Sequence, residues 1–130
     1  MNKQTVRQLW NDMDTQNWDN LPAYFHDDAK ISWPNTDEEF TVDEFVRVNR
    51  EYPGKWAIRV ERLIEAGNTI VSVVKVEAPG LSFHAVSFFD FADGKIKALD
   101  EYWGVDEEPP EWRVEQGLGK PGKTTAKLRD

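Results

Sequence analysis

The sequence predicts an α+β fold in which helices come first and an antiparallel sheet follows. Hydrophobic residues recur at helical spacing within the first fifty residues, and from Trp56 onward they alternate with polar residues at the period of two that is typical of half-buried strands. Helices and strands do not alternate along the chain as they would in a parallel βαβ sheet. A chain of 130 residues has room for a single domain with a sizeable core.

The first expected helix runs from Thr5 to Gln16. Val6 and Leu9 begin an apolar set with the spacing of one helical face, and Thr5 followed by Gln8 indicates a capping box at the helix start.

A second apolar set, which begins at Leu21, follows Asp19 and tolerates Pro22 in its first turn. Residues 31–33 are then expected to form a short strand, which Pro34 ends.

The clearest local signal is a helix start at Thr41. Glu44 lies three residues later, as a capping box requires, and Phe40 and Phe45 occupy the positions of a hydrophobic staple. This helix cannot continue past residues 52–54, which read Tyr-Pro-Gly.

Four strands are expected after this helix, and short turn sequences that contain glycine separate them. The expected strands cover residues 56–65, 70–78, 82–91 and 95–103.

The remaining C-terminal sequence has no regular period. Trp112 is expected to anchor residues 104–116 to the body, so we assign the domain to residues 1–116 and a flexible basic tail to residues 117–130. Residues 117–124 satisfy the text pattern of a P-loop, but too few residues follow to build the helix that this motif needs, and nucleotide binding is not expected.

Composition excludes several classes of function. A net charge of −8 disfavours nucleic acids and anionic membrane surfaces as partners. The chain has no cysteine and only two histidines, so neither a metal nor another cofactor is expected; the triplet His26-Asp27-Asp28 is interpreted as a helix end. No apolar stretch resembles a signal peptide or a membrane span, and the expected location is cytoplasmic.

Four sequence segments, at residues 14–19, 24–29, 89–96 and 101–103, resemble the SnoaL-like branch of the nuclear transport factor 2-like superfamily. With the order of the predicted helices and strands, the resemblance extends over residues 5–104. The resemblance implies a cone-shaped α+β barrel in which a curved antiparallel sheet wraps the helices and leaves a pocket. It also implies pairing of two copies through the outer sheet face. Members include ketosteroid isomerases, polyketide cyclases, dehydratases, epoxide hydrolases and binding proteins without catalytic activity, so the fold alone does not identify a reaction.

The catalytic residues of the ketosteroid isomerases are not found at the matching positions of this sequence. By the family's spacing, its catalytic tyrosine falls at Leu9, its carboxylate base at Trp33 and its oxyanion acid near Ser87, and none of these side chains can perform that role. Trp103 matches a tryptophan that lines the family's pocket. The resemblance therefore implies an aromatic pocket without the isomerase's proton-transfer groups.

Two residues are candidates for proton transfer. Glu101 shares a strand face with Trp103, and a carboxyl group buried against aromatic rings would have a raised pKa. The alternative for Glu101 is a salt bridge to Arg59 or Arg62 on another strand.

The meaning of His84 depends on the hairpin register. With a three-residue turn at residues 92–94, His84 lies opposite Tyr102 on the outer face; with a turn one residue shorter it lies opposite Trp103 on the pocket face.

Aromatic residues are expected to form the pocket wall, and Ser87 or Tyr52 to orient a ligand. The expected pocket residues are Trp33, Tyr52, Trp56, Ser87, Phe89 and Trp103, with Trp18 as a further aromatic candidate. The sequence thus predicts a homodimeric protein that binds a small hydrophobic or carbonyl-bearing molecule, with cofactor-independent acid–base chemistry at Glu101 or His84. The alternative is a non-catalytic dimeric module that fills its own pocket and binds another protein through its sheet face.

Overall fold

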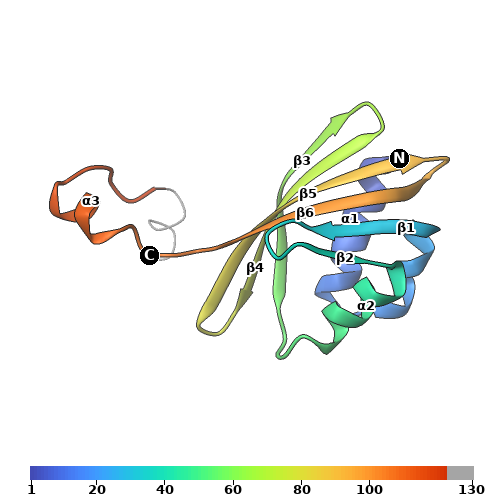
Figure 1. The fold of residues 1–130 in the computed structure, drawn as a ribbon, viewed down its shortest axis with the longest axis horizontal. Helices are drawn as coiled ribbons and strands as arrows, with labels where there is room; N and C mark the ends of the chain where they lie inside the picture. The colour runs from blue at the N-terminus through green and yellow to red at the C-terminus, as the bar shows by residue number, and fades with distance from the viewer. Residues whose placement is uncertain (123–130) are drawn as a thin grey trace.

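The computed structural model describes residues 1–122 and shows the expected α+β order (Figure 1). The end of the P-loop-like sequence and most of the basic tail lie outside the described residues. The elements are α1 (Asn2–Asp14), the 3₁₀ helix η1 (Trp18–Tyr24), β1 (Phe25–Trp33), β2 (Glu38–Phe40), α2 (Val42–Glu51), β3 (Ala57–Ala66), β4 (Thr69–Ala78), β5 (Leu81–Ala92), β6 (Lys95–Val105) and α3 (Glu111–Glu115).

The strands form one curved six-stranded sheet in the order β2-β1-β6-β5-β4-β3. The sheet does not close, and α1 and α2 lie together on its concave side (Figure 1). The prediction of an antiparallel sheet was wrong at one place, because β1 pairs with β6 in parallel. The two strands are distant in the sequence, and local patterns carry no information about their relative direction.

The two long helices differ in how well their starts were predicted. The capping box of α2 is confirmed: the Glu44 N–H donates to Thr41 Oγ1 at 3.2 Å, and the Thr41 N–H donates to Glu44 Oε1 at 3.0 Å. The capping box predicted at Thr5 is wrong, because α1 already begins at Asn2 and the Thr5 hydroxyl donates to the Met1 carbonyl at 3.4 Å.

The strand β1 is longer than predicted. Residues 26–28 were interpreted as a helix end but belong to this strand, which starts directly after η1. His26 donates from Nε2 to the Ala92 carbonyl at 2.5 Å, so its side chain fastens β1 to the end of β5. Phe25 and Lys30 pair with Ile96 and Ala98 of β6, and the pairing is irregular between them.

The hairpin of β5 and β6 has a register that neither alternative anticipated. Ala92 pairs with Lys95 across a two-residue Asp-Gly turn, and a bulge then shifts the pairing by one residue, so that His84 lies opposite Gly104. His84 therefore lies on the convex face. Glu101 lies on the concave face, where it is 1% exposed.

The core lies between the helices and the concave face. Val6 and Leu9 of α1 and Phe45 of α2 are fully buried, and the indole N–H of Trp10 donates to the Ser72 hydroxyl at 3.1 Å. This hydrogen bond fixes α1 to the middle of β4.

The C-terminal segment corrects a further prediction. Trp112 is 57% exposed and does not anchor the segment, since α3 stands away from the body at the end of a chain that continues β6 (Figure 1). The Asp106 N–H donates to the Ser82 carbonyl at 2.9 Å, and two prolines then separate this point from α3. The division into a domain of residues 1–116 and a basic tail stays a prediction.

Candidate functional site

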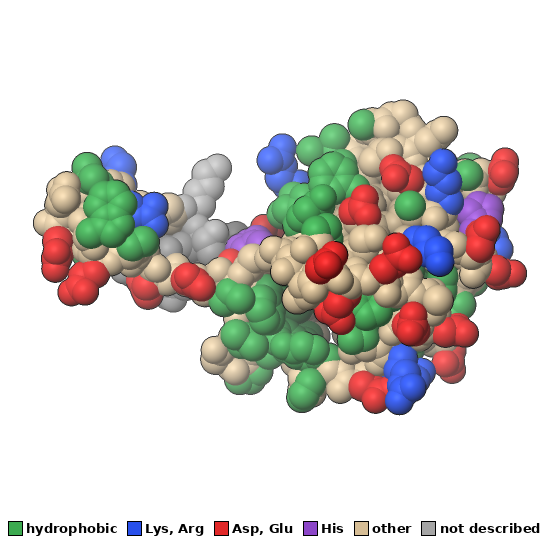
Figure 2. Space-filling view, in the orientation of Figure 1, with side chains coloured by type: hydrophobic (Ala, Val, Ile, Leu, Met, Phe, Trp, Pro, Cys, Tyr) green, Lys and Arg blue, Asp and Glu red, His purple; other side chains and the backbone are tan. Residues whose placement is uncertain are grey.

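A cavity of about 260 Å³ lies between the helices and the concave face of the sheet. Residues of α1, η1, α2 and five of the strands or their adjoining turns line it. Figure 2 shows hydrophobic side chains gathered at the lower end of the β4–β5 hairpin and the chain that follows α2, beside this cavity. A cavity of this size and apolar character can hold a small organic molecule.

Aromatic rings form a continuous part of the cavity wall. The ring centroids of Tyr52 and Trp56 are 5.0 Å apart, those of Trp56 and Phe83 5.5 Å, those of Phe83 and Trp103 6.1 Å, and those of Trp103 and Trp33 5.9 Å. Most of these contacts are edge-to-face, which is a favourable geometry for aromatic pairs. Four of the six expected pocket residues, Trp33, Tyr52, Trp56 and Trp103, thus lie on the wall.

The other two expected pocket residues lie elsewhere. Ser87 and Phe89 are fully buried and are not among the residues that line the cavity. Phe89 packs edge-to-face on Trp10 with 6.4 Å between ring centroids, because α1 covers this part of the concave face. Ser87 instead donates a hydrogen bond to Glu101.

Glu101 lies directly behind the aromatic wall. Its Oε1 accepts from Trp33 Nε1 at 3.0 Å and its Oε2 accepts from Ser87 Oγ at 2.8 Å. Burial raises the pKa of Glu101 to about 7, although the two hydrogen bonds act in the opposite direction. Trp33 is the contact between this carboxyl group and the cavity, which Glu101 itself does not line.

The alternative of a salt bridge from Glu101 is not observed in the described residues. Arg59 pairs with Glu61, with 3.5 Å between the guanidinium nitrogen and the carboxylate oxygen. Arg62 lies beside a bulge in β3, and β4 and β5 separate this edge strand from β6.

His84 belongs to a polar group on the convex face. Its Nδ1 lies 2.5 Å from Asp106 Oδ1 and its Nε2 lies 3.2 Å from Glu61 Oε1. Burial acts to raise the pKa of Asp106, but hydrogen bonds from Ser82 and His84 outweigh it and leave this pKa below its ordinary value. The sheet separates His84 from the cavity, so His84 lies on the outer face, one of the two positions that the register left open.

Sequence reasoning missed the polar part of the lining. Gln16, Asn35, Thr36, Asn49 and Arg50 lie on the cavity from three separate segments. Each occupies a helix end or a turn, where polar residues are ordinary, so the only sequence signal was their position next to predicted wall residues.

Within residues 1–122, no three acidic or histidine side chains gather as metal ligands would. Among the described helices none has both the length and the apolar character that a bilayer crossing needs.

Comparison with known proteins supports the architecture. Residues 6–99 match the family model of the SnoaL-like domain, whereas none of the curated proteins compared with the chain matches it. A solved structure from Kribbella flavida, provisionally named a ketosteroid isomerase, has 24% identity and a TM-score of 0.80, with 93% of this chain and 90% of that chain covered.

Two other solved structures show the same arrangement. An NTF2-like protein of unknown function from Burkholderia xenovorans has 23% identity and a TM-score of 0.76 over 92% of this chain and 94% of that chain. An LEH-like epoxide hydrolase from M. tuberculosis has 16% identity and a TM-score of 0.64, with 78% and 80% covered. At these identities the likeness shows the fold alone.

Proposed function

The chain belongs to the SnoaL-like domain family, and we propose that it binds a small hydrophobic or carbonyl-bearing molecule in the aromatic cavity. The observation that carries this proposal is a cavity of about 260 Å³ with a wall of tryptophan, tyrosine and phenylalanine rings. Burial of apolar ligand surface against such rings supplies binding free energy, and the rings are held in place by their mutual contacts.

The competing function, a non-catalytic module with a self-filled pocket, is less well supported. Such a module would close the space between α2 and the sheet with its own side chains, as α1 does at Phe89. The rings of Trp33, Trp56 and Trp103 instead surround an open volume.

The test uses 2-acetylnaphthalene, a neutral aromatic ketone, in isothermal titration calorimetry. We expect binding by the natural chain and at least about tenfold weaker binding by Trp56→Ala, because this ring contacts both Tyr52 and Phe83 on the wall. Trp112→Ala is the matched control, since Trp112 is exposed on α3. Absence of heat with the natural chain, or equal losses in the two variants, would contradict the proposal.

A second candidate function, acid–base chemistry at Glu101, rests on its burial and its pKa of about 7. A group with this pKa is able to take and return a proton near neutral pH. In the proposed step, the carboxylate removes a proton from the carbon next to a bound carbonyl, an enolate forms, and the protonated Glu101 returns the proton to that carbon. Trp33 lies between Glu101 and the cavity, so its ring must move before Glu101 can reach a bound carbonyl compound.

This step is measurable with the same ketone. In D₂O, a proton taken up by Glu101 exchanges with solvent deuterium before the carboxyl group protonates the enolate, so the methyl protons of 2-acetylnaphthalene should exchange for deuterium faster with the natural chain than with Glu101→Gln, as followed by NMR. Binding without accelerated exchange would leave the protein as a binding protein and remove Glu101 as a proton carrier.

We further propose that the protein is a homodimer through the convex face of the sheet. Ile64, Phe88 and Tyr102 are 42%, 38% and 45% exposed, and the rings of the last two meet edge-to-face. Large apolar side chains gathered on one face are typical of an interface. Light scattering should give a dimer mass for the natural chain and for Leu81→Asp, whose side chain lies at the end of β5, and a monomer mass for Phe88→Asp. A monomer mass for the natural chain would refute the proposal.

A further inference from the structure

The charge of the cavity lining differs in sign from that of the chain. The chain carries a net charge of −8, but among the described residues no aspartate or glutamate lines the cavity, and Arg50 is the one lysine or arginine that does. Its exposed side chain comes from the last turn of α2, so it lies at the entrance. An arginine here raises the local potential for anions in an otherwise acidic protein.

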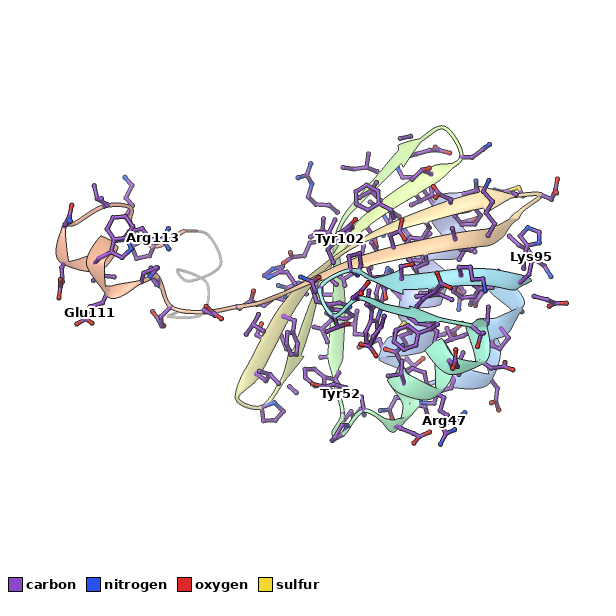
Figure 3. All side chains as sticks on the ribbon, viewed as in Figure 1. Arg47, Tyr52, Lys95, Tyr102, Glu111 and Arg113 are labelled. Carbon is purple, nitrogen blue, oxygen red and sulfur yellow. The ribbon has the colours of Figure 1, made fainter. Side chains whose placement is uncertain are left out.

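Arg50 is also free to pair with a ligand. In the described part of the chain no carboxylate lies within ion-pair distance of it, whereas Arg47 of the same helix pairs with Glu51. Figure 3 shows Arg47 on the side of α2 that faces away from the sheet, and Tyr52 beneath the sheet at the cavity. Of these two arginines, only Arg50 is among the residues that line the cavity.

One further hydrogen-bond donor lies on the cavity lining. The side-chain carbonyl of Asn35 accepts the backbone N–H of Trp103 at 2.9 Å, which leaves the amide NH₂ of Asn35 as a donor on the lining. A ligand that supplies an oxygen acceptor would accept a hydrogen bond from this group.

We propose that the ligand is a planar aromatic molecule with a carboxylate, and that Arg50 pairs with this carboxylate at the cavity entrance. The aromatic body lies against the wall of rings, where apolar area supplies most of the affinity. The carboxylate lies beside Arg50, which prefers this group because the guanidinium fork matches its two oxygens. This assignment rests on the proposed ligand-binding function and narrows the class of molecule.

The test compares three naphthalenes that share one shape and differ in charge. They are 2-naphthoate, the neutral 2-acetylnaphthalene and the cationic 2-naphthamidine, each titrated by calorimetry at about pH 6, where Glu101 is mainly protonated because its pKa is about 7. We expect 2-naphthoate to bind about tenfold more tightly than the ketone, and the amidine to bind more weakly than the ketone although the protein is acidic.

Two arginine variants make the assignment specific. Arg50→Gln should lower the affinity for 2-naphthoate to that for the ketone and change the ketone's affinity less than about twofold. Arg47→Gln removes the same charge from the same helix and should leave all three affinities unchanged. High salt should reduce the preference for 2-naphthoate, because the pair lies at the surface.

The outcomes separate this inference from the function on which it rests. If none of the three compounds binds, the proposed ligand-binding function fails. If the ketone binds but 2-naphthoate binds no better, or if both arginine variants lose the preference equally, ligand binding stands and the assignment of a carboxylate to Arg50 is overturned. Tighter binding of the amidine would overturn it in favour of an aromatic cage for cations.

Discussion

Replacement of Glu101 by glutamine is expected to change how the stability of the protein depends on pH. In the folded protein, burial raises the pKa of this carboxyl group from 4.5 to about 7. Unfolding exposes the group to water and returns its pKa to the ordinary value. The folded state thus holds this proton more tightly than the unfolded state does.

The sign and size of the effect follow from these two pKa values. Between about pH 4.5 and pH 7 the folded state binds more protons than the unfolded state, so the free energy of unfolding falls as the pH rises through this window. A difference of one between the pKa values corresponds to about 1.4 kcal/mol, so the complete loss above pH 7 is about 3 kcal/mol. Of this, about 2 kcal/mol falls between about pH 5.5 and pH 8.5.

Urea unfolding followed by tryptophan fluorescence at several pH values measures this effect. Glutamine cannot ionise, so the stability of Glu101→Gln relative to the natural chain should rise by about 2 kcal/mol from about pH 5.5 to pH 8.5. The altered hydrogen bonds to Ser87 and Trp33 add an offset that does not depend on the pH. Glu65→Gln, at an exposed position of β3, is the control and should run parallel to the natural chain. Parallel curves for Glu101→Gln would refute the reasoning.

Three other substitutions test local features by urea unfolding. Thr41→Ala removes the acceptor of the Glu44 N–H and should cost about 1 kcal/mol; no loss would show that the cap contributes nothing. Trp10→Phe leaves the buried Ser72 hydroxyl without its partner and should cost about 1–3 kcal/mol, with an unchanged midpoint as the contrary result. Gln16 has a φ of 61°, so Gln16→Gly should stabilise the protein by about 1 kcal/mol while it removes a lining amide; a lower midpoint would contradict this.

Local sequence patterns predicted the elements that depend on contacts between residues close in the sequence. The start of α2 was predicted because Thr41, Glu44 and the flanking phenylalanines give three independent cues at one place. The strands β3 to β6 were predicted because each buries one face and adjacent strands join through short turns. The start of α1 was missed because Thr5 with Gln8 has the spacing of a capping box, although the helix begins further upstream.

Features that depend on distant pairing could not be predicted from these signals. The parallel direction of β1 is set by β6, a neighbour far away in the sequence. The position of Trp112 was predicted wrongly because a large aromatic residue usually packs on something, and the sequence does not show how far β6 carries the chain from the body.

Most aromatic residues of the candidate site were predicted from the sequence, whereas its polar residues were not. Trp103 was expected at the wall from the family resemblance, and Trp33 and Trp56 because many aromatic residues surround one sheet. Asn35 and Arg50 resemble ordinary turn and helix-end residues, and only the tertiary structure brings them to one cavity. The face of His84 depended on a bulge in the β5–β6 pairing that has no sequence signature.

The position of Glu101 explains why binding is better supported than catalysis. An acid or base must lie within hydrogen-bond distance of the proton that it transfers, but both oxygens of Glu101 already accept hydrogen bonds, from Trp33 and Ser87. To reach the cavity, the carboxyl group must lose the hydrogen bond from Trp33, which leaves a partly buried indole N–H without this partner at a cost of about 1 kcal/mol. A ligand with an oxygen that accepts this N–H offsets the cost, whereas a pure hydrocarbon does not. We therefore expect carbonyl-bearing ligands to be better able than hydrocarbons to open a path from the cavity to Glu101.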